Sequence, residues 1–403
     1  MCSIFGVVGV NPDMEVLRRI AERAKDRGRD GGQMQRFDLS GGQVAYLGNW
    51  RATPTTEVWD VEPQPYDGVI HNGTIANDVE LGALPGEVDS MVLPRVIDRS
   101  NLDALTHSLG KVQGSYAMAI VSPRTVYAAV NYKPLHLLRI AEAVYFSSME
   151  RHLLPECGFG LRPGRVLPYT VTDLLTGDSR PIPRESTSRA LVVCSGGLDS
   201  TTVAYDMANQ GYEVDLLHFR YGCRAETREA TLVQKIANHL RREMIYLDID
   251  YSSFTGQSPL LTDNSITQGK AGAEYAHEWV PARNLLMIAH AVAYAEANGY
   301  SWVAIGNNLE ESGAFPDNEE EFTNLLGHAL DYAVHDGGQV RLISPVGGLM
   351  KHEIVKLGAG LGVPYELTWS CYYGREVHCG DCGPCFMRRT AFERNGLTDP
   401  VFA

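Results

Sequence analysis

Near residue 190 the chain changes from short β-rich runs to a regular alternation of strand and helix patterns. Before this point the runs VVGV, VIHNG, YAMAIV and VYFSS are separated by Gly, Pro and Asn turns. Beyond it, the alternation predicts a doubly wound parallel α/β sheet with ligands at the carboxyl ends of its strands. A chain of 403 residues is also too long for one ordinary core, so we expect two domains.

Local patterns place individual elements after residue 190. The segment 174–190, LLTGDSRPIPRESTSRA, has two prolines and little apolar content, which is typical of a linker. In TLVQKIANHL the apolar residues recur at helical spacing. The expected strands are 190–195, 212–219, 244–249 and 302–306, the expected helices are 198–208, 231–240 and 281–299, and the expected domains are 1–180 and 191–403, joined by a linker at 181–190.

Composition and charge exclude several classes of protein. The formal charge of −14 argues against broad nonspecific binding of nucleic acid, and no uncharged run is long enough to cross a bilayer. The first apolar run is not a secretory signal, because no basic region precedes it and Gly6 and Gly9 interrupt it. Four of the eight cysteines lie between 371 and 385, which indicates a metal site in a reducing cytoplasm rather than a disulfide framework.

Cys2, directly after the initiator methionine, has two interpretations. It could be a small apolar residue opening a buried strand. It could instead be an amino-terminal nucleophile, whose own α-amine acts as general base once the methionine is removed. Such a site also needs oxyanion donors, which the Asn72 amide and the Gly73 N–H in VIHNGTI can provide. An amino-acid substrate further needs a cation to bind its α-carboxylate and an anion to bind its α-ammonium group.

Together with DRGRDGG (26–32), Arg51 in LGNWRATPT and Asp89 in GEVDS, these residues resemble the class II glutamine amidotransferases over about residues 1–180. The resemblance implies an αββα sandwich of the Ntn-hydrolase type. It also implies that Cys2 attacks the glutamine carboxamide, that Arg51 binds the α-carboxylate and that Asp89 binds the α-amine. The sequence departs from the family at RGRDGG, where Arg-Gly-Pro-Asp is usual.

A second motif, LVVCSGGLDS (191–200), is a hydrophobic strand that runs into a glycine turn and a helix. Backbone N–H groups in such a turn, with a helix amino terminus behind them, favour a bound anion; a plain strand–helix turn is the alternative. The motif resembles the pyrophosphate loop of the PP-loop ATP pyrophosphatases, and Asp199 would hold Mg²⁺ against the phosphates of ATP. The ATP-binding residues implied are Ser195, Gly196, Gly197, Leu198, Asp199 and Ser200.

The third motif is the cysteine cluster Cys371, Cys379, Cys382 and Cys385. Four thiolates at this spacing can close a tetrahedral, structural Zn²⁺ shell. An iron–sulfur cluster is also compatible with four cysteines, and four unrelated buried thiols are the remaining alternative. We expect His378 to be a solvated loop residue rather than a fifth ligand.

Together with EWVPARNLLMIAH and GNNLEESGAFPDNEEEF, the cysteine motif resembles the 7-cyano-7-deazaguanine synthases over about residues 188–395. In that family, two ATP and ammonia convert 7-carboxy-7-deazaguanine into an amide and then a nitrile. The resemblance implies that the deazaguanine is bound by Arg283, Asn284, Phe315, Pro316 and Asp317.

The chain departs from this second family around the expected substrate pocket. The residues Arg220, Cys223 and Ala225 stand where Asp, Gln and His are usual. Glu310 and Glu311 lie near a usual Asp, and Asn318 replaces a usual Cys. These changes leave the identity of the acceptor open.

The two resemblances together predict a glutamine-dependent, ATP-consuming enzyme that makes 7-cyano-7-deazaguanine. An alternative is transfer of ammonia to the nitrile of this base within tRNA or phage DNA, which gives an archaeosine-type formamidine. A third reading, of another class, is a non-catalytic sensor of glutamine or deazaguanine. The expected partners are glutamine, ATP and a 7-deazaguanine, with no membrane, and the sequence leaves a homodimer open.

Overall fold

The computed structural model describes residues 2–53, 62–251, 258–266, 268–269, 278–335 and 339–402. It divides into two compact units, Met1–Glu185 and Ser186–Ala403, here called unit 1 and unit 2. No helix in the described ranges is long and apolar enough to cross a membrane.

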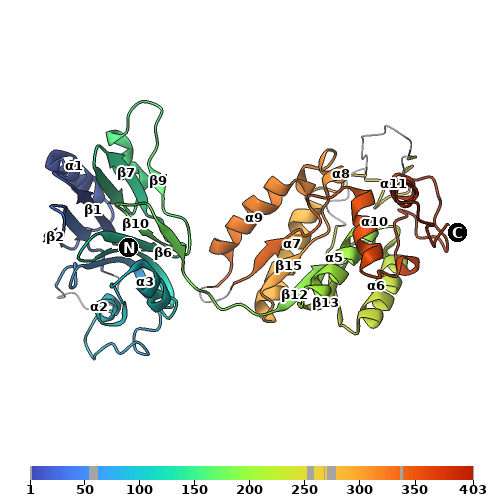
Figure 1. Ribbon diagram of the computed structural model, residues 1–403, viewed down its shortest axis with the longest axis horizontal. Coiled ribbons are helices and arrows are strands. Elements are labelled where there is room, and N and C mark those ends of the chain that lie inside the picture. The colour runs from blue at the N-terminus through green and yellow to red at the C-terminus, as the bar shows by residue number, and fades with distance from the viewer. Residues whose placement is uncertain are drawn as a thin grey trace. The chain divides into compact units, whose positions relative to one another are not determined.

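Unit 1 is built on two antiparallel sheets (Figure 1). The first has the order β2-β3-β1-β8-β7-β9 and consists of β1 (Ser3–Gly9), β2 (Gly32–Asp38), β3 (Val44–Trp50), β7 (His136–Ile140), β8 (Ala143–Ser147) and β9 (Gly164–Arg165). The second has the order β11-β10-β6-β5-β4 and consists of β4 (Val69–Ile75), β5 (Gly114–Val121), β6 (Val126–Val130), β10 (Thr170–Asp173) and β11 (Ser179–Pro181).

Three apolar layers show how the sheets and helices of unit 1 stack. One layer, which includes Ile4 and Ile70, lies between the sheets. A second joins the first sheet to α1 (Met14–Ala24) and α4 (Glu150–Leu153), and a third joins the other sheet to α2 (Leu93–Val96) and α3 (Leu102–Leu109). The helices thus cover the two outer faces, and the predicted αββα sandwich is confirmed.

Unit 2 contains a parallel sheet with the order β14-β13-β12-β15-β16. Its strands are β12 (Arg189–Val193), β13 (Glu213–Arg220), β14 (Met244–Asp248), β15 (Trp302–Ala304) and β16 (Arg341–Ile343). The strand order grows outward in both directions from β12, so the switch point lies between β12 and β15. The predicted doubly wound sheet is confirmed.

Helices cover both faces of this sheet (Figure 1). One face carries α5 (Leu198–Asn209), α6 (Glu226–Leu240), α10 (Lys351–Gly360) and α11 (Gly383–Arg394), and the other carries α7 (Arg283–Ala297) and α9 (Glu320–Ala333). The stripe predicted in α6 is buried at Leu232, Val233 and Ile236. The short helix α8 (Leu309–Ser312) follows β15.

The structure differs from the sequence prediction at the start of the linker-like segment. Residues 179–181 form β11, which pairs with β10 in a hairpin. Gly177, at a φ of +85°, provides the left-handed turn that closes the hairpin. The segment had too few apolar residues to predict a strand, but an edge strand needs only one paired side and can face solvent.

A buried ion pair ties the end of the described chain to α11. Arg388 is 1% exposed, and its Nε and Nη2 donate to the two carboxylate oxygens of Asp399 at 2.8 and 2.9 Å. The same guanidinium donates to Thr368 Oγ1 at 2.6 Å and to the Tyr365 carbonyl at 2.9 Å. The hydrogen-bond partners of this buried cation therefore come from two separate segments, one at residues 365–368 and one at residue 399.

We predict that Asp399→Ala strongly destabilises unit 2, by about 3–5 kcal/mol, because the Arg388 charge stays buried without its partner. Denaturant unfolding should show this as an earlier transition. The matched control is Asp248→Ala, which breaks an exposed pair with Arg220 and should change the transition little. Equal effects of the two substitutions would contradict the role given to the buried pair.

Candidate functional site

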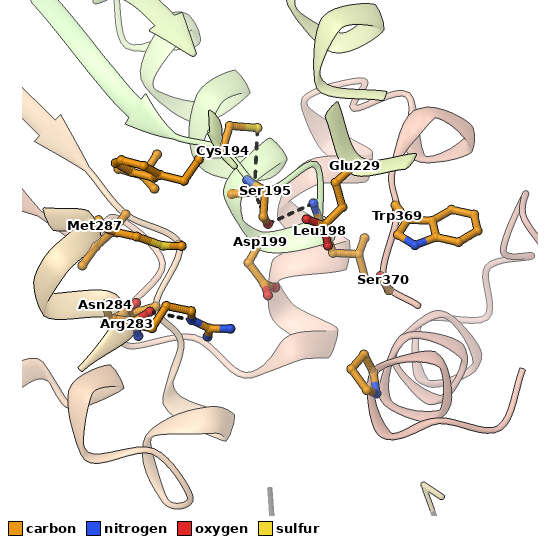
Figure 2. A pocket seen from close by; sticks show the side chains of 18 of the residues that line it. Cys194, Ser195, Leu198, Asp199, Glu229, Arg283, Asn284, Met287, Trp369 and Ser370 are labelled. Atoms are coloured by element: carbon orange, nitrogen blue, oxygen red, sulfur yellow. Dashed lines mark hydrogen bonds between the residues drawn. The ribbon is translucent and has the colours of Figure 1, made fainter. Parts of the chain in front are cut away.

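A cavity of about 260 Å³ opens in unit 2 at the carboxyl ends of β12, β13 and β15 (Figure 2). Cys194 and Ser195 follow the first of these strands, Phe219 is the last residue but one of the second, and Gly306 follows the third. The position agrees with the expectation for a doubly wound sheet, where loops at the switch point diverge and leave room for a ligand.

The loop after β12 forms one wall of this cavity. The Gly197 N–H donates to Ser195 Oγ at 3.3 Å, and Ser195 Oγ lies 3.3 Å from Ser200 Oγ. Gly196 has a φ of +78°, and an added Cβ would lie only 3.0 Å from a methyl carbon of Val233. The loop ends at the amino terminus of α5, so its backbone N–H groups and the helix dipole both favour an anion.

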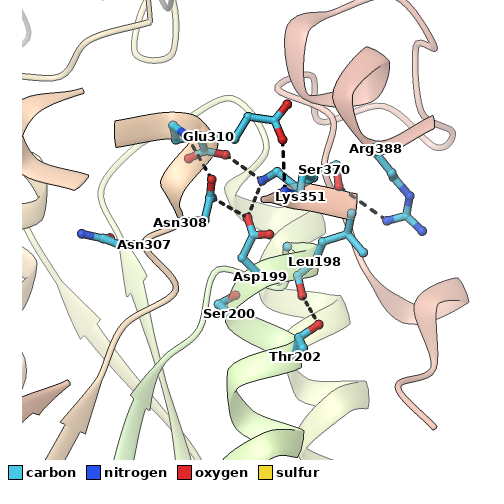
Figure 3. Close-up of polar contacts among 12 residues, drawn as sticks. Leu198, Asp199, Ser200, Thr202, Asn307, Asn308, Glu310, Lys351, Ser370 and Arg388 are labelled. Atoms are coloured by element: carbon cyan, nitrogen blue, oxygen red, sulfur yellow. Dashed lines mark hydrogen bonds and ion pairs between the residues drawn. The ribbon is translucent and has the colours of Figure 1, made fainter. Parts of the chain in front are cut away.

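Beside the loop, a buried lysine joins two carboxylates (Figure 3). Lys351 Nζ lies 2.5 Å from Asp199 Oδ2 and 2.7 Å from Glu311 Oε1. Asn308 Nδ2 also donates to Asp199, at 3.4 Å. Burial disfavours the ammonium, but the two carboxylates outweigh it and hold the pKa of Lys351 above its usual value.

This cluster has the features that Mg²⁺ requires when it accompanies ATP. One cation faces two carboxylates, and burial raises the pKa of Asp199, so a further cation beside this carboxylate would favour its ionised form. The other oxygen of Asp199, Oδ1, is buried and has no hydrogen-bond partner among the described residues. Such an oxygen suits a cation that takes one or two carboxylates and completes its shell with phosphates and water.

Sequence reasoning missed Lys351. The available signal was its position as the first residue of a helix. A cation there is disfavoured by the helix dipole, which indicates that nearby carboxylates compensate for it. Its carboxylate partners lie 152 and 40 residues away in the chain.

The structure separates the five residues assigned to the deazaguanine. Arg283 and Asn284, at the start of α7, line the cavity on the side opposite Trp369 and Ser370 (Figure 2). Phe315, Pro316 and Asp317 are not among the lining residues. Phe315 stacks on Trp279 with ring centroids 6.2 Å apart, and the Asp317 carbonyl accepts a bond from Asn307 Nδ2 at 3.0 Å.

Of the residues that depart from the family pattern, some line the cavity and others do not. Cys223, Ala225, Glu311 and Asn318 line the cavity. Arg220 does not; it forms an exposed ion pair with Asp248. Glu310 lies at the edge of the lysine cluster, where its Oε2 accepts from the Lys351 backbone N–H at 3.0 Å.

A half-buried glutamate, Glu229, also lines the cavity and was missed from the sequence. Burial, partly offset by Arg283, raises the pKa of Glu229 to about 7. The Cys223 thiol lies 3.8 Å from its Oε2.

The four cysteines of the third motif come together. The sulfur atoms of Cys371, Cys379, Cys382 and Cys385 all lie within 4.8 Å of one another. Tetrahedral zinc, with Zn–S bonds of about 2.3 Å, places its sulfur ligands roughly 3.8 Å apart. Backbone N–H groups of Tyr373 and of two of the cysteines point at the sulfurs, at 3.3–3.5 Å. The donor set therefore fits a closed metal shell.

His378 is not the solvated loop residue expected from the sequence. Its ring packs against Trp369, with centroids 4.1 Å apart, and against Phe402 at 5.5 Å. Its Nε2 accepts the Ser370 backbone N–H at 3.1 Å. The side chain therefore packs on and bonds to residues 369–370, which directly precede Cys371 of the cysteine cluster.

Unit 1 gathers the residues predicted to surround Cys2. Cys2 immediately precedes β1, Arg51 immediately follows β3, and Asn72 and Gly73 lie on β4. β4 belongs to the second sheet but contacts both β1 and β3 of the first. Gly73 has a φ of +152°, and a Cβ there would lie 1.8 Å from the Ser115 carbonyl oxygen, so no other residue fits.

The pKa of Tyr66 responds to several residues of the same group. Burial raises the pKa of Tyr66 to about 12; nearby Arg51 opposes the shift, and Cys2 and Asp89 add to it. Asp89 is held at the start of a 3₁₀ helix, where its Oδ2 accepts the Ile75 N–H at 2.7 Å. Tyr66, which was not predicted from the sequence, is therefore close enough to Arg51, Cys2 and Asp89 to respond to their charges.

Comparisons with known proteins give the family. Residues 189–396 match the family model described as queuosine biosynthesis protein QueC. The 7-cyano-7-deazaguanine synthase of Sulfolobus acidocaldarius is 40% identical, with 100% of this chain and 99% of that protein covered.

Other similarities cover less of the chain or are weaker. The 7-cyano-7-deazaguanine synthase of Methanothermobacter thermautotrophicus is 38% identical; the match covers 53% of this chain and 98% of that protein. A solved glutamine phosphoribosylpyrophosphate amidotransferase from B. subtilis, complexed with ADP and GMP, aligns with 89% of this chain and 92% of its own, at 14% identity and a TM-score of 0.35. On the full-length relative and the family model, the chain belongs to the 7-cyano-7-deazaguanine synthase family.

Proposed function

We propose that this enzyme converts 7-carboxy-7-deazaguanine into 7-cyano-7-deazaguanine, with ATP as activator and with ammonia released from glutamine at Cys2. The observation that carries the proposal is the single cavity in which the anion-favouring loop, Lys351 and Arg283 meet. Carboxylate activation needs these elements, because it must hold a triphosphate beside an anionic acceptor.

In unit 2, a carboxylate oxygen of the substrate attacks the α-phosphate of ATP, and pyrophosphate leaves. Ammonia then displaces AMP to give the amide. The amide oxygen attacks the α-phosphate of a second ATP, a second pyrophosphate leaves, and loss of AMP and protons gives the nitrile. The backbone N–H groups of Ser195–Gly197 bind the pyrophosphate, and Lys351 stabilises its negative charge. Asp199 and Glu311 would hold the Mg²⁺ that neutralises the phosphates.

In unit 1, the α-amine of the processed chain takes the proton of Cys2, and the thiolate attacks the glutamine carboxamide. Asn72 Nδ2 and the Gly73 N–H stabilise the oxyanion, while Arg51 and Asp89 bind the α-carboxylate and α-amine. The protonated α-amine then gives its proton to the amide nitrogen, the C–N bond breaks, and ammonia leaves as the thioester forms. Water hydrolyses the thioester to glutamate and restores the thiol. Ammonia made within the same chain is unprotonated when it forms, which raises its effective concentration over that from neutral solution.

The four-cysteine cluster of unit 2 would bind one structural Zn²⁺. All four positions of the shell are taken by thiolates, so the metal contributes folding free energy and no chemistry. Four thiolates also bind iron–sulfur clusters, so the metal content distinguishes zinc from iron.

Transfer of ammonia to a nitrile already carried by tRNA or DNA remains the alternative. The altered residues Cys223, Ala225 and Asn318 line the cavity, which favours a changed acceptor. The loop and its lysine cluster favour the first reaction, because addition to a nitrile requires no pyrophosphate site.

The first prediction concerns the ammonia source. Cys2→Ala keeps a small second residue but removes the nucleophile, so glutamine-driven synthesis should fall by at least about a thousandfold. Synthesis from high ammonium should stay within about twofold, because ammonium reaches unit 2 from solution. Cys157→Ala, a half-buried cysteine of unit 1, is the control and should change neither rate. Loss of both activities in Cys2→Ala would show that the assignment is wrong.

The second prediction separates the two acceptor reactions. With 7-carboxy-7-deazaguanine, ATP and ammonium, pyrophosphate should appear in step with product, and Asp199→Asn should lower both rates by about a hundredfold or more. Asp206→Asn, on the same helix, is the matched control and should leave both rates unchanged. Glutamine hydrolysis should survive in Asp199→Asn. Formamidine formed on a polynucleotide without pyrophosphate release would replace this reaction by the alternative.

The third prediction concerns the metal. Elemental analysis should find about one zinc per chain, and Cys382→Ser should lose the metal and unfold unit 2, because structural metal binding is coupled to folding. Cys157→Ser should keep both metal and fold. Iron with visible absorption would identify a cluster instead, and a metal-free protein with full activity would exclude both.

A further inference from the structure

Two buried asparagines in unit 1 have side-chain atoms without hydrogen-bond partners. Asn49 on β3 and Asn72 on β4 are each 1% exposed. Within the described part of the chain, Asn49 Nδ2 and both polar side-chain atoms of Asn72 are buried and unpartnered. Buried polar groups nearly always have partners, so each of these atoms requires an explanation.

Both side chains face the layer between the two sheets. Asn49 alternates with Ala45 and Leu47, which belong to the apolar core of that layer, and it pairs with Ile4 of β1. Asn72 alternates with Ile70 of the same core. β4 contacts both β1 and β3, and Asn49 pairs with Ile4, which lies two residues after Cys2.

Another buried asparagine of unit 1 shows what a structural amide looks like. Asn77 Nδ2 donates to the Lys111 carbonyl at 3.0 Å, and its Oδ1 accepts the Gln113 N–H at 2.9 Å. Its amide is therefore used fully to join two backbone segments. The Asn49 N–H₂ group donates no such hydrogen bond among the described residues, so its burial lowers the stability of the protein without ligand.

We propose that Asn49 Nδ2 is a further donor in the glutamine site and binds the carboxamide oxygen of the substrate as it becomes an oxyanion. The inference rests on the proposed glutamine reaction and deepens it. Asn49 lies on β3 two residues before Arg51, which directly follows the strand, and it is the more deeply buried of the two, at 1% against 9% exposed. With Arg51 binding the α-carboxylate, the acceptor left for a deeper donor is the carboxamide oxygen.

The test is Asn49→Leu, which keeps the size of the side chain and removes the donor. The value of kcat for glutamine hydrolysis should fall about a hundredfold, the typical effect of deleting one oxyanion donor, while KM changes less than about threefold. Synthesis from ammonium should match that of the wild type. The thermal midpoint should stay equal or rise, because an unpaired buried group is removed.

Two further variants complete the comparison. Asn49→Asp has the same shape but places an acceptor where the donor was, so glutamine turnover should be at least as low as in Asn49→Leu. Asn77→Ala is the matched control: it removes a fully bonded buried amide, so the thermal midpoint should drop while glutamine turnover by folded protein is kept.

Several outcomes would overturn the inference. These are wild-type turnover in Asn49→Leu or Asn49→Asp, a rise in KM without loss of kcat, or a lowered thermal midpoint with parallel loss of ammonium-driven synthesis. All of them leave the proposed function intact as long as the wild-type protein hydrolyses glutamine. A wild-type protein that does not hydrolyse glutamine would instead overturn the proposed function, and this inference with it.

Discussion

The pairing of β12 with β13 on one side and β15 on the other determines what unit 2 can do. Because the chain leaves β12 in both directions across the sheet, the loops after these strands separate at their carboxyl ends. The anion-favouring loop follows β12, and Asn307 and Asn308 follow β15. α10 then brings Lys351 against the first turn of α5. Each group in the cavity depends on this one reversal of strand order.

Unit 1 meets a different requirement with a different architecture. Cys2 lies directly before β1, so its position depends on how firmly this strand is held. β1 is an interior strand of its sheet, paired with β3 and β8, so its first residues are fixed from both sides. The sandwich then places the edge strand of the second sheet, β4, in contact with β1 and β3. Cys2 and Asn72 belong to different sheets, and their strands come into contact because the two layers stack.

Sequence patterns predicted what depends on neighbouring residues. The strand–loop–helix unit around Ser195, the stripe on α6 and the cysteine cluster are local, because spacing alone determines which side chains meet. Prediction failed where partners are distant. Lys351, Tyr66 and Glu229 have surroundings set by residues distant in the chain, and His378 was misread because folding brings Trp369 and Phe402 to it. The β11 strand was missed because an edge hairpin needs little apolar content.

The buried pair between Arg388 and Asp399 has a practical consequence for handling the protein. Arg388 lies one helical turn after Cys385 on α11. The same stretch of this helix therefore carries one residue of the cysteine cluster and the partner of Asp399. A chain truncated after Leu397 would keep all four thiols and every cavity residue, and still lack the carboxylate that seats this helix. Truncations and carboxy-terminal fusions designed from the motifs alone would therefore give poorly folded material, whereas those placed beyond Asp399 with a flexible spacer would spare it.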